Sequence, residues 1–237
     1  MATDSSSSAS DSEDSTKEER PSKKLRSEDA AVTAPLELAP SVGAPKSKTK
    51  GQPIIVLLDQ ATIETVKNRR GVYELLNCDD HRDLCKKKLH KDPNLFRPDI
   101  LHQELLALSD SPLNKAAMLK VYIQTTKRVL IDVNPAIRIP RTYKRFAGLM
   151  VQLLHKMKIK ASSESTTLLK VIKNPFSQYL PPGTRCHGMS CQGTLDSPIA
   201  LAKSLLPPLP DEGKAPTCFV VGAMATGHIT IEDHPYI

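Results

Sequence analysis

Three arginines recur at spacings of three and four residues in one short segment, which holds Arg138, Arg141 and Arg145. The segment leads into an apolar-periodic stretch that predicts a helix from about Thr142 to Met157. Cations at a helix N-terminus oppose the helix macrodipole, so selection for stability alone would favour acids there. Arginine also makes bidentate contacts with phosphate. The pattern therefore favours a phosphate-binding ridge, on which Arg141 and Arg145 would share one helix face. A solvated basic face or internal salt bridges are the alternative.

Arg97 and Asp99 form a second candidate site. A carboxylate two residues from an arginine can hold the guanidinium in one orientation through an ion pair. The alternative is that Asp99 only caps a helix predicted over residues 100–110. The residues alone leave both interpretations open.

Gly222 and Gly227 follow an apolar run that predicts a buried strand. Glycines in such a loop let the backbone approach a ligand closely. The spacing is not the dinucleotide fingerprint, and a Walker motif is absent from the sequence, so a phosphate cradle for ATP or a dinucleotide is disfavoured. A plain turn at the strand end is the alternative.

The cysteines do not predict a metal centre. There are five, and they lack the spacing of a zinc finger. Cys186 and Cys191 lie near His187, which is a weak metal signal, and reduced thiols are the better interpretation. No apolar run approaches the roughly 18 residues of a membrane span. We therefore expect neither a metal nor a membrane among the partners.

The charge is distributed unevenly along the chain. The formal net charge is +7, and residues 51–237 carry 25 of the 33 basic and 17 of the 26 acidic side chains. The basic excess thus belongs to the part that is expected to fold, which favours a polyanionic partner and nucleic acid first. Solubility alone is the alternative.

Composition divides the chain into a tail and one domain. Residues 1–50 are rich in Ser, Ala, Pro and charge, so we expect a disordered tail. A small basic cluster at Lys23, Lys24 and Arg26 could serve as a nuclear signal. Residues 51–237 have the length and the apolar content of one α/β domain.

The apolar patterns predict the elements that position the candidate residues. Pro53–Asp59 is a continuous apolar run and predicts a buried parallel strand. Residues 60–67 are predicted to form a short helix, and Ser111-Pro112 begins another. We further expect an antiparallel hairpin over 120–133, a strand over 168–173, a turn-rich loop over 181–193 and a strand over 217–221. The helix after Thr142 should bury a stripe that consists of Phe146, Leu149, Met150, Leu153 and Met157.

Several long blocks together resemble one known family. They are "YELLNCDDH", "RPDILHQELLALSDSPLNKA", "LIDVNPAIRIPRTYKRFAGLMVQLLHK", "LLKVIKNP" and "FVVGAMATG". In this order they resemble the Nep/Emg family of small-subunit ribosomal RNA pseudouridine N1-methyltransferases, of the SPOUT superfamily. The match runs from about Pro53 to Gly227.

The resemblance implies a fold, a reaction and partners. The fold would be α/β with a C-terminal trefoil knot, in a homodimer. The reaction would transfer a methyl group from S-adenosylmethionine to N1 of a pseudouridine in small-subunit rRNA. The resemblance also implies work in the nucleus and nucleolus, alongside ribosome assembly factors, in biogenesis of the small ribosomal subunit.

The resemblance also assigns roles to residues of this chain. Arg97, Arg138, Arg141 and Arg145 match rRNA-contacting arginines, and Asp99 matches the acid that holds Arg97. The residues that match cofactor-binding positions are Met189, Gly222, Gly227, His228 and Ile229, although the segment around Met189 departs from the family's usual sequence. No catalytic base is assigned; Asp99 is a candidate, but its expected role is to hold Arg97.

The last residues, "IEDHPYI", stand where the family continues with a loop and a final helix that complete the knot. We therefore expect the final knot helix, and with it part of the S-adenosylmethionine pocket, to be missing from residues 51–237. Two functions remain open on this basis. One is the rRNA methyltransferase, and the other is an RNA-binding ribosome assembly factor that does not transfer methyl groups.

Overall fold

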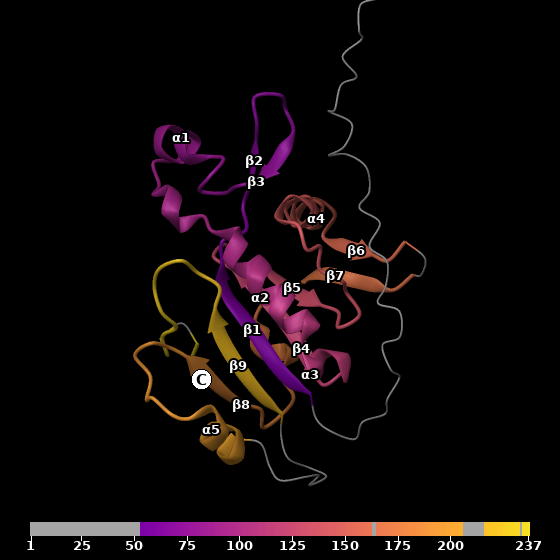
Figure 1. The fold of residues 1–237 in the computed structure, drawn as a ribbon, viewed down its shortest axis with the longest axis vertical. Helices are drawn as coiled ribbons and strands as arrows, with labels where there is room; N and C mark the ends of the chain where they lie inside the picture. The colour runs from indigo at the N-terminus through magenta and orange to yellow at the C-terminus, as the bar shows by residue number, and fades with distance from the viewer. Residues whose placement is uncertain (1–52, 163–164, 206–215, 233) are drawn as a thin grey trace, which may run out of the picture. The chain divides into compact units, whose positions relative to one another are not determined.

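The computed structural model describes residues 53–162, 165–205, 216–232 and 234–237 (Figure 1). The predicted disordered tail over residues 1–50 lies outside these residues. The strands are β1 (Ile54–Ala61), β2 (Thr65–Lys67), β3 (Tyr73–Leu75), β4 (Leu119–Thr125), β5 (Leu130–Val133), β6 (Lys158–Lys160), β7 (Thr167–Ile172), β8 (Arg185–Met189) and β9 (Thr217–Gly222). The α-helices are α1 (Arg82–Leu84), α2 (Pro98–Asp110), α3 (Pro112–Lys115), α4 (Tyr143–Lys156) and α5 (Pro198–Leu205), and the other helical turns are the π-helical η2 (Cys85–Leu89) and the 3-10 turns η3 (Pro93–Leu95) and η4 (Phe176–Tyr179).

The described strands form one mixed sheet in the order β6-β7-β5-β4-β1-β9-β8, with β2 and β3 paired separately. β1 has a parallel neighbour on each side, β4 and β9, and β8 pairs in parallel with β9. Ile55, Leu57 and Leu58 are at most 3% exposed, which confirms the predicted buried parallel strand. Because these strands run in one direction, the carboxyl ends of β1, β8 and β9 meet at one edge of the sheet.

The other half of the sheet is antiparallel. β4 pairs with β5, as the predicted hairpin requires, and β5 and β6 both pair with β7. The turn between β4 and β5 places Arg128 at a positive φ of 58°. The predicted strand over 168–173 is confirmed by β7, which begins at Thr167.

Helix α4 follows the predicted pattern closely. Thr142 is its N-cap residue and Met157 its C-cap residue. Phe146, Leu149, Met150 and Leu153 are completely buried, as predicted. Met157 is 54% exposed, so its assignment to the apolar stripe was wrong. It adopts a left-handed conformation with φ of 60°, which turns the chain out of the helix before β6.

Two local predictions were wrong because each missed a strand. The predicted helix over residues 60–67 is absent, because β1 continues to Ala61 and Thr65–Lys67 form β2. The β-branched residues in this segment favour extended backbone over helix. The loop predicted over 181–193 contains strand β8, which pairs with β9. The glycine and polar residues of β8 do not form a strand pattern in the sequence, and pairing with β9 stabilises the strand.

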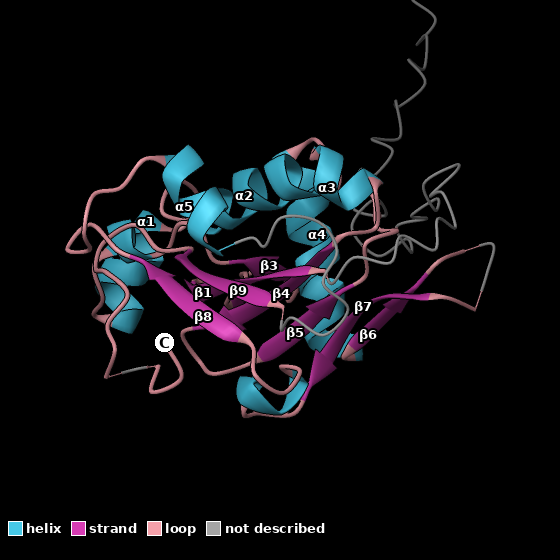
Figure 2. Cartoon of the chain, turned by 90° about the horizontal axis from the view of Figure 1, so that it is seen from below, coloured by secondary structure: helices cyan, strands magenta, loops and turns pink. Residues whose placement is uncertain are grey.

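Apolar side chains cover both faces of the sheet. Alternate residues of β1 point to opposite faces, so Val56 and Leu58 join a core with α2 and α4, whereas Ile55 and Leu57 join a core with Phe176 of η4. Figure 2 shows α2 and α3 packed on one face of the sheet.

An insertion between β1 and α2 contains β2, β3, α1, η2 and η3. It has its own small core of Leu76, Cys85 and Phe96. Figure 1 shows it beyond the carboxyl end of β1. Its two ends are joined, because the backbone N–H of Arg97 donates a hydrogen bond to Thr62 Oγ1 at 3.1 Å.

Candidate functional site

Arg97 and Asp99 form a bidentate ion pair at the start of α2. Arg97 Nε lies 2.8 Å from Asp99 Oδ1, and Arg97 Nη2 lies 2.7 Å from Asp99 Oδ2. The hydrogen bonds from Arg97 lower the pKa of Asp99, and backbone N–H groups of Asp99 and Ile100 lower it further. The same pairing raises the pKa of Arg97. The carboxylate thus holds the guanidinium in one orientation and also accepts hydrogen bonds from the first helical turn.

Asp99 is not the N-cap residue of α2. The helix begins at Pro98 with Arg97 as its N-cap residue, and Asp99 lies in the first turn. A carboxylate in the first turn is favoured by the helix dipole. Pro98 accounts for the earlier start, because proline is well suited to the first position of a helix.

The loop before α4 exposes its arginines by burying the residues between them. Ile137 and Ile139 are buried, whereas Arg138 and Arg141 are exposed. Polar contacts hold the loop against α2 and α3: His102 Nε2 of α2 lies 2.7 Å from the carbonyl oxygen of Pro140, and Asn114 of α3 donates to the carbonyl of Pro135. The arginines therefore project from a fixed backbone.

Arg141 and Arg145 do not share the first turns of the helix, contrary to the predicted arrangement. Arg141 precedes the N-cap residue Thr142, whereas Arg145 lies within the first turn of α4. Both side chains are exposed. The ridge consequently runs from loop to helix, with only its last arginine on the helix.

The arginine segment is poorly neutralised by the rest of the described chain. Arg141 Nη2 lies 3.9 Å from Asp110 Oδ2, and these side chains are 87% and 66% exposed. Such an exposed pair contributes little stability. Arg138 and Arg145 have no ion pair within the described residues. Internal salt bridges therefore do not explain why these cations are present.

Tyr143 is the first residue of α4 and lies within electrostatic reach of Asp99, and the sequence patterns did not indicate it. Its hydroxyl is buried and has no hydrogen-bond partner among the described residues. Burial raises the pKa of Tyr143, and the charges of Asp99 and Asp80 raise it further. Its ring centroid lies 6.1 Å from that of His102, which in turn stacks on Phe146. In the sequence, a tyrosine beside an apolar stripe resembles an ordinary core residue. Only the structure shows that its hydroxyl is buried without a partner among the described residues.

The predicted cofactor residues gather at the carboxyl edge of β8 and β9. Gly222 ends β9 opposite Asp59 of β1, and Met189 ends β8 opposite Val221. Gly227 has φ of 109°, a conformation that favours glycine. Ile229 is buried against the same edge, whereas His228 is exposed. All five predicted residues thus lie along one edge or in its loop, and the side chain of His228 is exposed.

A buried polar chain lies at the same edge and was not predicted. His234 Nε2 lies 2.8 Å from Asp59 Oδ2, and His234 Nδ1 lies 2.7 Å from the hydroxyl of Tyr236. The side chains of His234 and Asp59 are 2% and 4% exposed. A buried carboxylate requires such a partner. An aspartate that ends an apolar strand run was the available sequence signal.

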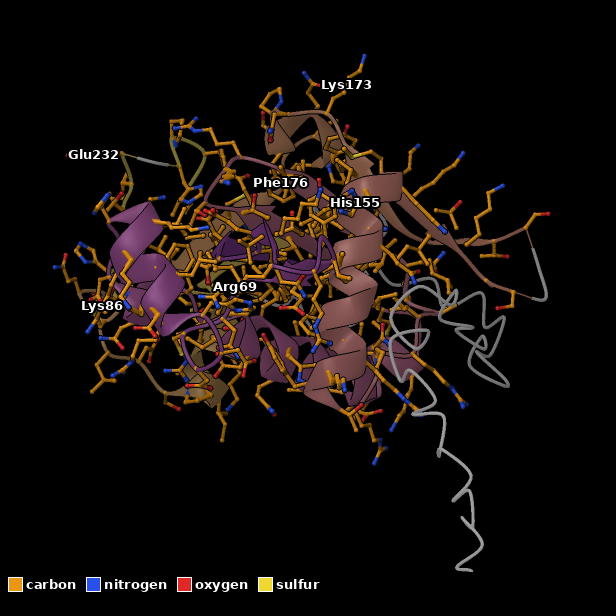
Figure 3. The ribbon with its side chains drawn as sticks, turned by 90° about the horizontal axis from the view of Figure 1, so that it is seen from above. Arg69, Lys86, His155, Lys173, Phe176 and Glu232 are labelled. Atoms are coloured by element: carbon orange, nitrogen blue, oxygen red, sulfur yellow. The ribbon has the colours of Figure 1, made fainter. Side chains whose placement is uncertain are left out.

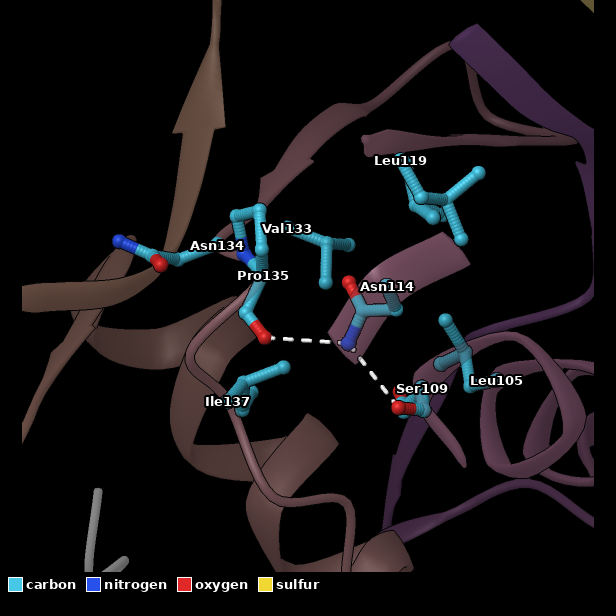
Figure 4. Close-up of a pocket in the computed structure, with 9 residues that line it drawn as sticks. Leu105, Ser109, Asn114, Leu119, Val133, Asn134, Pro135 and Ile137 are labelled. Carbon is cyan, nitrogen blue, oxygen red and sulfur yellow. Dashed lines mark hydrogen bonds between the residues drawn. The ribbon is translucent and has the colours of Figure 1, made fainter. Parts of the chain in front are cut away.

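A small cavity beside α2 is not the site. Figure 4 shows it among Leu105, Asn114, Val133 and Ile137, and Asn114 spans it with hydrogen bonds to Ser109 and Pro135. Its volume of 10 Å³ leaves room for at most about one water. In the part of the chain that the structure describes, we find neither a metal-ligating cluster nor a helix that could cross a membrane.

Comparison with known proteins gives a consistent result. A family model described as EMG1/NEP1 methyltransferase matches residues 56–236. The chain is 44% identical over 218 residues to the ribosomal RNA small subunit methyltransferase mra1 of Schizosaccharomyces pombe, covering 86% of this chain and 59% of that protein. It is 46% identical over 208 residues to the ribosomal RNA small subunit methyltransferase NEP1 of Mus musculus, covering 88% and 80%. For NEP1 of Homo sapiens the identity is 49% over 193 residues, covering 81% and 75%.

The fold also matches a solved structure. Archaeoglobus fulgidus Nep1, bound to S-adenosylhomocysteine, has a TM-score of 0.58 and 25% sequence identity, and the match covers 76% of this chain and 83% of that one.

Removal of the His234 imidazole should destabilise the protein. His234→Ala leaves the buried carboxylate of Asp59 without its partner, so we expect a loss of about 1–3 kcal/mol in the free energy of unfolding. Urea denaturation measures it. His228→Ala, at an exposed position, serves as the control and should change stability by less than about 0.5 kcal/mol. Equal effects of the two substitutions would contradict the assigned role of His234.

Glu104 predicts a dependence of stability on pH. Its Oε2 is buried without a partner among the described residues, and burial raises its pKa from 4.5 to about 7. The folded chain therefore keeps a proton that the unfolded chain releases, so stability falls as the pH rises through this interval. Glu104→Gln should match the parent protein at pH 4 and exceed its stability at pH 8 by about 1–2 kcal/mol.

Urea denaturation at several pH values measures this difference. Asp110→Asn, which alters an exposed carboxylate on the same helix, is the matched control and should show less than about 0.5 kcal/mol at either pH. A Glu104→Gln variant whose advantage is independent of pH would refute the explanation.

Proposed function

The chain belongs to the EMG1/NEP1 methyltransferase family, and on that premise we propose that it methylates N1 of a pseudouridine in small-subunit ribosomal RNA. S-Adenosylmethionine is the proposed methyl donor. The RNA part of this proposal rests on Arg138, Arg141 and Arg145. Their side chains are exposed, and internal ion pairs leave their charge largely uncompensated. The names of the relatives support the substrate, and the S-adenosylhomocysteine in the archaeal structure supports the cofactor.

The arginines are proposed to bind the phosphates around the target nucleotide. Arg138 and Arg141 extend from a loop that is pinned to α2, and Arg145 extends from the first turn of α4. Arg97 adds a guanidinium whose orientation Asp99 sets. Fixed cations at several points favour one position of the RNA, and a base must be turned out of its stack before its ring nitrogen can react.

The cofactor is proposed to bind at the carboxyl edge of β8 and β9, held mainly by backbone. Gly222 and Gly227 remove side chains at the two ends of one loop, and Ile229 supplies a buried apolar surface beside it. Ligands bind at this edge in open α/β sheets, where neighbouring strands connect in opposite directions. Met189, Gly222, Gly227 and Ile229 would hold the cofactor there. When bound, S-adenosylmethionine supplies a methyl group on a sulfonium, which is already an activated donor.

The chain's own residues then need to position the base and lower the cost of losing the N1 proton. Cations near the base stabilise negative charge that develops on it. Asp99 is engaged by Arg97 in a bidentate pair, and this favours its orienting role over that of a proton acceptor.

A second candidate function is RNA binding in ribosome assembly without methyl transfer. One observation favours it: side chains of this chain already lie at the cofactor edge. Met224 Cε stands 2.4 Å from where a Cβ of Gly222 would be, and Ile237 lies against Gly188. His234 also lies at this edge, where it contacts Asp59 near the end of β1. In this arrangement a cofactor would have to displace them.

The family resemblance supports further proposals about the setting of this activity. We infer a homodimer and a location in the nucleus and nucleolus together with ribosome assembly factors. The basic cluster at Lys23, Lys24 and Arg26 is compatible with import into the nucleus.

Methyl transfer can be tested with two matched RNAs. The protein is incubated with S-adenosylmethionine carrying a labelled methyl group and a small-subunit rRNA fragment that contains either pseudouridine or uridine at the target. We expect label only in the pseudouridine RNA, because uridine has a glycosidic bond at N1. Calorimetric titration with S-adenosylmethionine accompanies the assay. RNA binding without transfer and without heat at millimolar cofactor would favour the assembly function.

The Arg97–Asp99 pair predicts coupled losses of RNA affinity. Asp99→Ala frees Arg97 from its fixed orientation, so it should weaken RNA binding nearly as much as Arg97→Ala does. The double variant should be little worse than either single one. Fluorescence anisotropy with the pseudouridine RNA measures the three affinities. Independent losses that add in the double variant would show that Asp99 does not act through Arg97.

A further inference from the structure

The two strands at the β6 edge of the sheet place like charges opposite each other. Lys158 of β6 and Lys170 of β7 are direct partners in the antiparallel register, and both side chains are exposed. Like charges in this arrangement destabilise a strand pair. A sequence selected only for a stable ribbon would place an acid at one of the two positions.

The lysines point to one face of the sheet. Ile159 and Leu169 form the next pair in the register, and both are buried in the core that contains α4. Since neighbouring residues of a strand point to opposite faces, Lys158 and Lys170 point away from α4. Lys160 is two residues beyond Lys158 and is also exposed. The three lysines thus lie on the face of the sheet opposite that covered by α4.

The nearest acid on this face is already engaged. Asp132 of β5 is the partner of Lys170 in the register. Its carboxylate forms an ion pair with Lys120 of β4, and both side chains are about one-third exposed or less. Within the residues that the structure describes, Lys158, Lys160 and Lys170 have no ion pair. Lys173, at the end of β7, also points away from the protein, whereas Phe176 lies inside (Figure 3).

Protection of an edge strand explains only part of this pattern. Charged side chains on an edge strand prevent pairing with other chains, and β6 is such a strand. That accounts for Lys158 and Lys160. It does not account for Lys170, because β7 is an interior strand with a partner on each side. A cation at that position adds repulsion without protecting an edge.

We propose that Lys158, Lys160 and Lys170 form a second RNA-binding surface, which contacts phosphates of the RNA that flanks the target. The inference rests on the proposed RNA substrate. Lysines bind phosphate as point charges without the paired geometry of arginine, so this surface binds independently of sequence. The arginines belong to the face that carries α2 and α4, and β6 is the edge between the two faces. An RNA that reaches both surfaces passes around this edge.

RNA length and salt dependence together test the proposal. The Lys158→Gln/Lys170→Gln variant is compared with an Arg185→Gln/Lys203→Gln variant, which removes the same charge from β8 and α5 at the other side of the sheet. Each is titrated over a range of salt with a short hairpin that holds only the target loop and with a longer fragment extended on both sides. For every phosphate that the protein no longer neutralises, the slope of log affinity against log salt should become shallower by roughly 0.7–0.9.

We expect the β6–β7 variant to have a shallower slope only with the longer fragment and the control to keep the parent slope. Equal slopes for the two variants, or equal changes with both RNAs, would overturn the proposal. If the variant binds RNA as the parent protein does but no longer binds an acidic peptide that the parent protein binds, the surface belongs to a protein partner instead. The midpoint of urea denaturation should not fall in the variant, because a repulsive pair is removed.

Failure of this proposal can be separated from failure of the proposed enzyme. Methylation of the short hairpin should be unchanged by Lys158→Gln/Lys170→Gln. If the parent protein methylates neither RNA but shows the length-dependent slope, the lysine surface stands and the methyltransferase assignment falls. If the parent protein methylates the RNA and the lysine variant keeps the parent slope with both RNAs, the methyltransferase assignment stands and the lysine surface falls.

Discussion

The parallel pairing of β1 with strands on both sides is the constraint on which the rest of the molecule depends. Backbone groups of β1 can be satisfied only by β4 on one side and β9 on the other. The pairing with β9 joins Ile55 to Cys218, two residues that are separated by most of the domain. The parallel pairings also bring Asp59, Gly222 and Met189 to a common edge. The edge at which we propose that the cofactor binds is therefore a direct result of the sheet order, whereas the positions of the arginines depend on how the next layer packs on the sheet.

That next layer is held by polar contacts rather than by apolar burial alone. His102 stacks on Phe146 and contacts the carbonyl of Pro140, so one imidazole ties α2, α4 and the arginine loop together. It is 2% exposed. The proposed RNA surface thus has a rigid base, so binding of a phosphate would order the arginine side chains without reordering the backbone beneath them. A preformed backbone lowers the entropy cost of binding, so several individually weak contacts can together hold the RNA.

Much of the fold was accessible from the sequence where one physical signal dominated. The apolar run of β1 and the periodic stripe of α4 both express burial, and both were predicted correctly apart from Met157. β8 was missed because its residues carry no strand pattern of their own, and only pairing with β9 makes them a strand. The same reason hides the contact of His234 with Asp59, which joins residues 175 positions apart. The arginines were found because their charge is unusual at a helix start. Tyr143 was missed because what distinguishes it is a buried hydroxyl that no residue in the described part of the chain hydrogen-bonds.

The hydrogen bond from the Arg97 backbone to Thr62 closes the insertion between β1 and α2 at its base. A segment whose two ends meet can change in length or sequence without moving the strands on either side of it. The insertion also has its own small core and touches α4 through Tyr73 and His155. Because its last residue is Arg97, a change within the insertion acts first on the Arg97–Asp99 pair at the start of α2, while the strands of the sheet keep their pairing.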